Sequence, residues 1–254
     1  MHIRDVTIIM PTSVSPTHPS TEIIDQVIAS VRKHFPDNEI ILQVDGLRDE
    51  QKHRKEQYDE YKNRILWKSM HEWKNVLPII FDEHSHQSTM IEKTIHLVRT
   101  PAIFYIEGDV AIRDEAEVNW QEIMDMLDSE KAYTVRFYSF NIFIEPVHME
   151  MMMKQEGDFI QTFQWSQQPH VSLTSYYKNM VIPNTVPKLF IEDHFYGKVF
   201  VDCHDDDHKG WDKHRLWLYN PLNKKDIRIA LHLDGRRGLK KFTSDDEAWG
   251  LTEV

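Results

Sequence analysis

The sequence contains little cysteine, little glycine and no long apolar segment. Its single cysteine, Cys203, excludes internal disulfides and cysteine-rich zinc modules, and it fits a reducing compartment. No apolar run approaches the roughly 18 residues needed to cross a bilayer, and the N-terminal residues lack the layout of a signal peptide. The 8 glycines form no glycine-rich linker. We therefore expect a soluble, cytoplasmic protein, and 254 residues leave room for one large domain or two small ones.

Basic side chains are outnumbered, with 30 Lys and Arg against 41 Asp and Glu, and the net charge of −11 argues against a general nucleic-acid coat protein. The charge is unevenly spread: residues 102–160 hold 4 basic and 13 acidic side chains, whereas residues 209–241 hold 10 basic and 3 acidic ones. A solvated surface is the simplest interpretation of any single charge. A late basic segment in an acidic protein can nevertheless bind a phosphate group locally.

Bulky aromatic residues supply core material, with 7 Trp, 9 Tyr and 12 Phe. Short β-branched runs alternate with longer amphipathic runs, which is typical of an α/β fold with a mostly parallel central sheet flanked by helices. The expected strands cover residues 5–10, 39–46, 77–81, 102–106, 133–145 and 227–234, the first being ended by Pro11. The expected helices begin at Ser20 or Thr21 and after Glu192, and cover residues 49–74, 88–98 and 117–128.

Three of the expected strands end in polar residues, where ligands bind in open α/β sheets. Glu107 and Asp109 are two apart in an extended segment, so their side chains point the same way. Paired carboxylates suit a hard divalent cation, Mg²⁺ or Mn²⁺. An ordinary turn would explain the tripeptide 107–109 by itself, but its position after an apolar strand, with Asp45 ending an earlier one, favours a ligand site. The polar strand ends are Pro11, Thr12 and Ser13, then Asp45 and Gly46, then Glu107, Gly108 and Asp109.

These motifs resemble those of nucleotide-sugar glycosyltransferases with the GT-A fold, most of all glycosyltransferase family 2. Residues 6–12, 30–32 and 40–46 are similar to the first β-α-β unit of that family, and 107–109 is similar to its Asp-X-Asp motif. The resemblance covers about the first 115 residues clearly and the remainder loosely. It implies one GT-A-like (Rossmann-like) domain over 1–254, with a nucleotide-sugar-binding half over about 1–115. A smaller mixed C-terminal part, 116–254, would bind the acceptor and carry the catalytic base.

The resemblance also implies roles for single residues. In the family, the acidic residue that ends the second strand binds the nucleotide base, which implies this role for Asp45. The last carboxylate of the Asp-X-Asp motif binds the metal, which implies Asp109. Glu107 stands where the family has Asp, and it would bind the metal or contact the ribose or a water. The donor-contacting residues implied in this half are Pro11, Thr12, Ser13, Asp45, His86, Gln87, Glu107 and Gly108.

Histidines allow more than one metal site. His84 and His86 share a side of an extended segment, and zinc is often bound by such histidine pairs. The rest of the sequence, however, offers no further ligands with a spacing that would complete a zinc site. GT-A enzymes often supply a late histidine to the metal, which implies His232, with His204 as the competing choice. A polar hairpin turn is the structural alternative for the segment around 234.

The catalytic base of inverting family members is an acidic residue near the start of a late helix. This implies Asp193 as first choice and Glu192 as second, although either could simply cap the helix. Arg236 and Arg237 would neutralise the departing phosphates. Trp165 would suit stacking on an acceptor sugar, although such a residue is more often part of the core.

Together these features predict a metal-dependent, inverting glycosyltransferase that uses Mn²⁺ or Mg²⁺. A UDP-sugar is the default donor, and GDP stays open because Asp45 would accept equally from uracil or guanine. The acceptor would be a glycan or a modified DNA base of the kind that bacteriophages glycosylate. One alternative is a non-catalytic nucleotide-binding module. Another is a metal-dependent hydrolase that uses His84, His86, Asp109 and His204.

Overall fold

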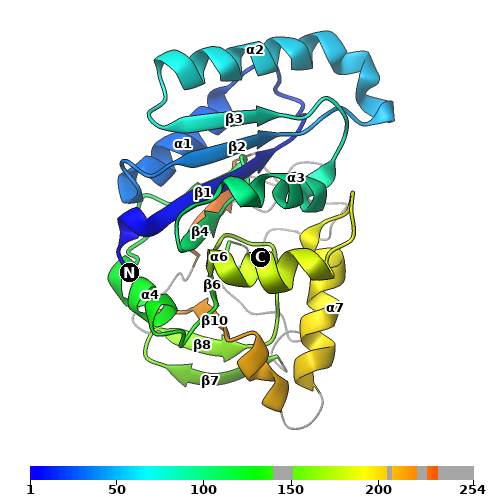
Figure 1. The fold of residues 1–254 in the computed structure, drawn as a ribbon. Coiled ribbons are helices and arrows are strands. Elements are labelled where there is room, and N and C mark those ends of the chain that lie inside the picture. The colour runs from blue at the N-terminus through cyan, green and yellow to red at the C-terminus, as the bar shows by residue number, and fades with distance from the viewer. Residues whose placement is uncertain (140–150, 205–207, 222–227, 234–254) are drawn as a thin grey trace, which may run out of the picture.

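The structure, a computed structural model, describes residues 1–139, 151–204, 208–221 and 228–233. Its centre is a nine-stranded sheet with the strand order β3-β2-β1-β4-β9-β6-β10-β8-β7 (Figure 1). These strands are β1 (Val6–Thr12), β2 (Ile40–Val44), β3 (Val76–Ile80), β4 (Ala102–Tyr105), β6 (Thr134–Arg136), β7 (Met152–Glu156), β8 (Phe159–Thr162), β9 (His170–Leu173) and β10 (Leu216–Tyr219). A separate two-stranded sheet consists of β5 (Val110–Ile112) and β11 (Ala230–His232).

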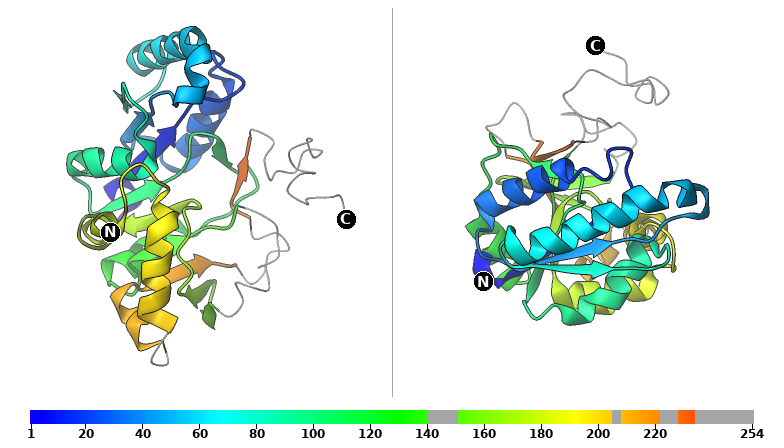
Figure 2. Two further views of the ribbon diagram at one scale, coloured as in Figure 1. Left: turned by 90° about the vertical axis from the view of Figure 1, so that its right-hand side faces the viewer. Right: turned by 90° about the horizontal axis from the view of Figure 1, so that it is seen from above.

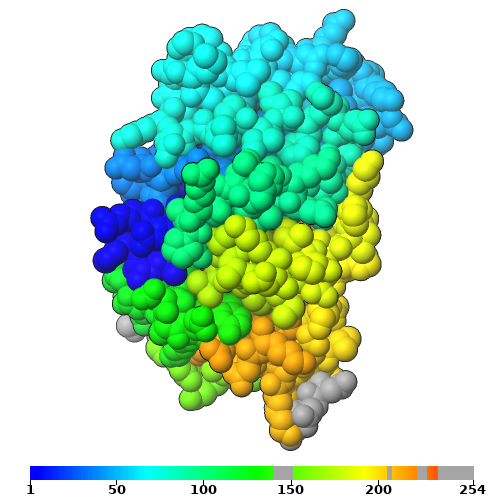
Figure 3. All heavy atoms as spheres, viewed as in Figure 1, coloured from blue at the N-terminus to red at the C-terminus, as the bar shows by residue number. Residues whose placement is uncertain are grey.

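The helices surround the central sheet. They are α1 (Glu22–His34), α2 (Lys55–His71), α3 (His86–Thr94), α4 (Trp120–Asp128), α6 (Thr174–Tyr176) and α7 (Ile191–His204). Shorter helical turns are η1 (Ile3–Asp5), η2 (Asp49–Arg54), η3 (Ile95–Leu97), η4 (Tyr177–Val181), η5 (Ile182–Asn184) and η6 (Lys209–Lys213). Figure 2 shows α1 and α3 on opposite faces of the sheet. Figure 3 shows that α3 and the segments around α6 cover the strands on one of these faces.

The first four strands of the sheet, β3, β2, β1 and β4, are parallel. Ile9 of β1 lies opposite both Ile41 of β2 and Tyr105 of β4. All of β2, and all of β1 except Thr12, is buried, as expected for continuous apolar runs inside a parallel sheet. Because these strands run in one direction, their carboxyl ends meet at the same edge of the sheet.

Antiparallel pairing in the central sheet always involves β7, β8 or β9. Strand β9 lies antiparallel between β4 and β6, while β10 is parallel to β6 and antiparallel to β8. The expected α/β class, with a central sheet flanked by helices and a mixed C-terminal part, is confirmed.

Helix α1 follows from the spacing of its apolar residues. Thr21 precedes its first turn, and acidic residues lie in that turn, where they interact favourably with the helix dipole. The apolar residues recur every three or four positions, so they form one stripe that packs into the core. The buried members of this stripe are Ile24, Val27, Ile28 and Val31.

The expectation that Pro11 ends the first strand is wrong, because β1 continues to Thr12. In a parallel sheet a proline is excluded where its missing N–H would be needed by the ladder. The pairing with β4 has already ended at Ile9 opposite Tyr105, so no ladder bond is lost at Pro11. The Pro11 carbonyl still accepts a hydrogen bond from the Gly108 N–H, at 2.8 Å.

Two other expectations change in detail. The predicted helix over 49–74 is the short turn η2 followed by α2, which ends at His71. The predicted last strand is present as β11, but it pairs with β5 and not with the central sheet. The expected strand over 133–145 is present as β6, and residues from 140 onward lie outside the described residues. Within the described part of the chain, no helix is both long and apolar enough to cross a membrane.

Candidate functional site

A cavity of about 200 Å³ lies at the carboxyl ends of the parallel strands. It is lined by the loops that follow β1, β2 and β4, by the N-terminal turn of α3 and by the residue that precedes α7. Asp45 and Asp109, which come from different strands, both line it, as the sequence predicts. The other lining residues that matter here are Pro11, Thr12, Ser13, Arg48, His84, His86, Gln87, Glu107, Gly108 and Phe190.

Two glycines allow the loops around this cavity to pack closely. A Cβ atom added at Gly108 would lie 2.9 Å from Thr12 Cβ and 2.9 Å from Ile24 Cδ1. At Gly46, an added Cβ atom would lie 2.2 Å from the carbonyl carbon of Glu83. Both contacts are shorter than side chains tolerate, so each position needs glycine for packing within the chain itself.

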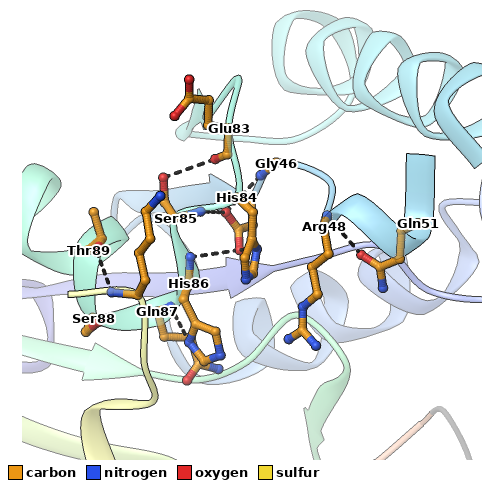
Figure 4. A network of polar contacts seen from close by, with 12 residues as sticks. Gly46, Arg48, Gln51, Glu83, His84, Ser85, His86, Gln87, Ser88 and Thr89 are labelled. Carbon is orange, nitrogen blue, oxygen red and sulfur yellow. Dashed lines mark hydrogen bonds and ion pairs between the residues drawn. The ribbon is translucent and has the colours of Figure 1, made fainter. Parts of the chain in front are cut away.

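The Asp45 carboxylate holds in place the loop before α3, whose Ser85 and His86 are labelled in Figure 4. Its Oδ1 accepts hydrogen bonds from the backbone N–H groups of Gly46 and Ser85, at 2.8 and 2.7 Å. Its Oδ2 accepts from the His86 N–H at 3.0 Å, and His84 Nδ1 lies 2.9 Å from the same oxygen. The Asp45 side chain is only 3 % exposed. These contacts position His84 and His86 on the cavity wall.

Three residues form a group that could bind a divalent cation: Glu107, Asp109 and His232. Each offers one ligand atom, and these atoms all lie within 4.8 Å of one another. The antiparallel pairing of β11 with β5 brings His232 to this place, opposite Val110, and His232 Nδ1 lies 3.9 Å from Asp109 Oδ2. Two carboxylates and one imidazole form a set of metal ligands that suits Mn²⁺ or Mg²⁺.

The Glu107 carboxylate is held by two glutamine amides. Its Oε1 accepts hydrogen bonds from Gln87 Nε2 at 2.7 Å and from Gln167 Nε2 at 3.0 Å. Burial and the neighbouring Asp109 carboxylate raise the pKa of Glu107, whereas His232 and the two amides lower it. A cation bound here would offset the repulsion between the two acidic side chains.

The two candidate bases differ in their surroundings. Asp193 is exposed, and its Oδ2 accepts a hydrogen bond from the Phe190 N–H at 3.2 Å, as a helix cap does. Glu192 is half-buried, and its Oε2 accepts from the Gln167 N–H at 2.9 Å and from Ser166 Oγ at 3.3 Å. Neither carboxylate is among the residues that line the cavity.

Three further residues contribute to this region without being predicted from the sequence: Gln167, Arg48 and Phe190. Gln167 connects the cation group to α7, because its Oε1 accepts the Ile191 N–H at 2.9 Å while its amide donates to Glu107. Phe190 is 46 % exposed and packs edge-on against His86, with ring centroids 4.3 Å apart. A short polar run at 166–168 was the only sign of Gln167 in the sequence.

The expectation that Trp165 stacks on an acceptor is wrong. Its side chain is 1 % exposed and packs edge-on against Phe195, with ring centroids 5.1 Å apart. It belongs to the hydrophobic core, and its ring also packs edge-on against His170 of β9, with centroids 5.7 Å apart. The alternative hydrolase set is also not brought together, since His204 neither lines the cavity nor joins the cation group, and its ring stacks on Phe200. Arg236 and Arg237 lie outside the described residues.

Among the residues that the structure describes, the zinc pair suggested for His84 and His86 has no third ligand. Within the described ranges, the one group of side chains able to bind a metal contains neither histidine. His84 faces Asp45, and burial and the nearby His84 and Arg48 charges lower the pKa of His86. These two rings therefore form a wall of the cavity and not a metal centre.

Comparison with known proteins supports the fold. No family model matches the chain, and no curated protein matches it either. Among solved structures, S. aureus TarS 1–349 in complex with UDP-GlcNAc superimposes with a TM-score of 0.52 at 14 % identity, covering 97 % of this chain and 64 % of that one. GalNAc-T7 with UDP, GalNAc and Mn²⁺ gives a TM-score of 0.54 at 10 % identity, covering 89 % and 42 %.

The chain has a GT-A fold. A longer S. aureus TarS structure matches with a TM-score of 0.51 at 12 % identity over 97 % of this chain, but only 38 % of that chain is covered. This chain thus spans less than two thirds of each of these proteins. At such low identities the likeness concerns the fold, and the chemistry has to be argued from the site.

Proposed function

We propose that this chain is a metal-dependent glycosyltransferase that transfers a sugar from a nucleoside diphosphate sugar, by default a UDP-sugar, to a hydroxyl group. One observation carries the proposal: a single cavity at the ends of the parallel strands joins the Asp45 loop to the group formed by Glu107, Asp109 and His232. The similar solved structures include complexes with UDP-GlcNAc and with UDP, GalNAc and Mn²⁺, which supports the same class of donor here.

The residues of the cation group have separate tasks in this proposal. Glu107, Asp109 and His232 would hold Mn²⁺ or Mg²⁺, which supplies positive charge that stabilises a departing diphosphate. Because Glu107 Oε1 accepts both glutamine amides, Oε2 is the oxygen that remains for a ligand. The hydroxyl groups of Thr12 and Ser13 line the same cavity, where they can donate hydrogen bonds to a phosphate or a ribose.

Asp193 is the proposed base that takes the proton of the acceptor hydroxyl, with inversion at the anomeric carbon. It stands in the first turn of α7, which contacts the cation group through Gln167. Its Oδ2 caps the helix, so Oδ1 is the oxygen for the acceptor. Glu192 is the second candidate, and its Oε2 already accepts two hydrogen bonds. We therefore assign Glu192 a part in holding α7 against the strand ends.

The donor site can be tested by thermal unfolding with UDP and GDP, each with and without Mn²⁺. A ligand at one hundred times its Kd stabilises the folded state by about 2.7 kcal/mol. For a chain of this length that is a rise in Tm of roughly 5 to 10 °C. We expect this rise only when nucleotide and Mn²⁺ are both present. Absence of any response to either nucleotide would reject the proposed donor site.

The base assignment can be tested with Asp193→Ala and Glu192→Gln. The assay is release of UDP from UDP-glucose or UDP-N-acetylglucosamine in the presence of Mn²⁺, with water as the acceptor. Loss of a general base typically lowers turnover 10²- to 10⁴-fold. We expect that loss for Asp193→Ala while the nucleotide-dependent rise in Tm is retained. Retention of turnover would refute the assignment, and a non-catalytic nucleotide-binding module would show no turnover in the unaltered protein.

The acceptor is proposed to be the hydroxyl group of a glycan or of a hydroxymethylated DNA base. Residues 209–241, which carry 10 basic and 3 acidic side chains, support the phosphate-bearing alternative. Contacts with DNA phosphates release counterions, so transfer to duplex DNA should fall steeply as salt is raised. Transfer to an uncharged glycan should depend little on salt.

A further inference from the structure

The Asp45 carboxylate is buried and is largely used within the chain itself. A carboxylate offers about four lone-pair positions, and three backbone N–H groups already donate to this one. Gly46 N and Ser85 N donate to Oδ1, while His86 N donates to Oδ2, and His84 Nδ1 lies 2.9 Å from Oδ2. Only 3 % of the side chain is exposed. A more exposed acceptor in the same cavity is therefore better placed for a nucleobase N–H.

His84 offers that acceptor. Its Nδ1 is buried 2.9 Å from Asp45 Oδ2, at an angle that makes no hydrogen bond. A proton on Nδ1 avoids placing a nitrogen lone pair against that oxygen, and Nε2 is then the acceptor. The side chain is 26 % exposed and lines the cavity. The Asp45 charge thus favours the tautomer in which Nε2 can accept a hydrogen bond.

Arg48 offers donors beside this acceptor. It stands two residues beyond Gly46 at the start of η2, lines the cavity and is exposed. Its backbone N–H donates to Gln51 Oε1 at 3.3 Å, which anchors the turn. Figure 4 shows its guanidinium directed to the same side as the rings of His84 and His86. Over the residues that the structure describes, no carboxylate forms an ion pair with this guanidinium, so its five N–H donors are available to a ligand.

We propose that His84 and Arg48, and not Asp45, contact the nucleobase of the donor: His84 Nε2 accepts the ring N–H of uracil or guanine, and Arg48 donates to the adjacent carbonyl oxygen. This rests on the proposed function. An acceptor next to donors matches the N–H and carbonyl edge that these two bases share. Cytosine and adenine carry an amino group in place of that carbonyl and an acceptor in place of that N–H. The site should therefore reject both of them, because its own polar groups would be left unpaired.

Binding of UDP, GDP, CDP and ADP, each with Mn²⁺, tests the proposal by titration calorimetry. The unaltered protein should bind UDP or GDP more tightly than CDP and ADP. Arg48→Ala and His84→Phe should each weaken binding of the preferred nucleotide about tenfold and leave CDP and ADP unchanged. Arg48→Lys, which keeps a donor, should recover part of the loss. Arg64→Ala and His53→Phe remove an exposed arginine and histidine away from the cavity, so they should leave all four affinities unchanged.

Three results would overturn the proposal. Unchanged base preference in both Arg48→Ala and His84→Phe would show that the base is bound elsewhere. Equal weakening of all four nucleotides in Arg48→Ala would show that Arg48 binds phosphate. Absence of Mn²⁺-dependent binding of any nucleotide to the unaltered protein would reject the proposed function itself, and this inference with it. Unfolding of each variant without ligand confirms that the substitutions leave the fold intact.

Discussion

Substitution of Gln167 by alanine separates the cation group from α7. The Gln167 amide group donates to Glu107 Oε1 and to Gln87 Oε1, and its oxygen accepts the Ile191 N–H at 2.9 Å. Alanine removes all of these contacts but keeps the backbone N–H that donates to Glu192. The carboxylate then keeps only one of its two amide partners, which is Gln87.

The size of the effect follows from these contacts. A hydrogen bond to a charged group contributes about 1.5–3 kcal/mol, and Gln87 still satisfies part of the Glu107 charge. The buried Ile191 N–H would lose its partner, at about 1–3 kcal/mol. We expect Gln167→Ala to lower the free energy of unfolding by about 2 kcal/mol. Loss of a residue that orients a metal ligand typically weakens metal binding 10- to 100-fold, so Mn²⁺ affinity should fall at least about tenfold.

Urea unfolding without Mn²⁺ measures the first effect, and calorimetric titration with Mn²⁺ measures the second. Gln168→Ala is the matched control, because among the described residues the Gln168 side chain accepts only the Ser139 N–H, at 3.3 Å. That variant should bind Mn²⁺ as the unaltered protein does. If Gln167→Ala unfolds more easily but binds Mn²⁺ with unchanged affinity, the amide stabilises α7 alone and our account of Glu107 is refuted.

Three further substitutions test other parts of the site. Asp109→Asn should abolish the rise in Tm caused by nucleotide with Mn²⁺ while leaving the fold intact, and a persistent rise in thermal unfolding would contradict the cation site. Gly108→Ala should lower the free energy of unfolding by about 1–3 kcal/mol, measured in urea, because its Cβ atom would lie 2.9 Å from two side chains. Burial and the Arg54 charge lower the pKa of His18 from 6.5 to about 4. The unfolded chain therefore binds this proton first, so stability is complete above pH 6.5 and is lost as pH falls towards 4. The unaltered protein should lose roughly 3 kcal/mol of unfolding free energy through His18 between pH 6.5 and 4, and His18→Phe should abolish this loss. If stability depends on pH equally in His18→Phe and in the control His53→Phe, His18 is not the group responsible.

The sequence predicts the N-terminal half of the molecule well because its signals are local. Apolar runs that end in acidic residues indicate both the parallel strands and the edge at which Asp45 and Asp109 meet. The error at Pro11 arises because the length of a strand depends on where its neighbour stops. That information lies in β4, which is distant in the sequence.

The other half is harder to predict because its contacts join distant segments. Nothing near Gln167 in the sequence shows that its amide will reach Glu107 on one side and α7 on the other. The pattern around Trp165 likewise cannot distinguish a stacking surface from a core position, since an aromatic residue suits both. The role of Asp45 shows a third limit. Its position at the strand end is visible in the sequence, but the loop that donates hydrogen bonds to its oxygens is not.

The pairing of β11 with β5 has a consequence for how the protein is made. Asp109 and Glu107 emerge from the ribosome long before His232, so the three side chains can meet only after most of the chain has been synthesised. A cation that requires all three would bind the nascent chain weakly and the finished protein tightly. By mass action it would then hold β11 in place. Tight binding would in this way require that translation has passed His232, and displacement of β11 would weaken it.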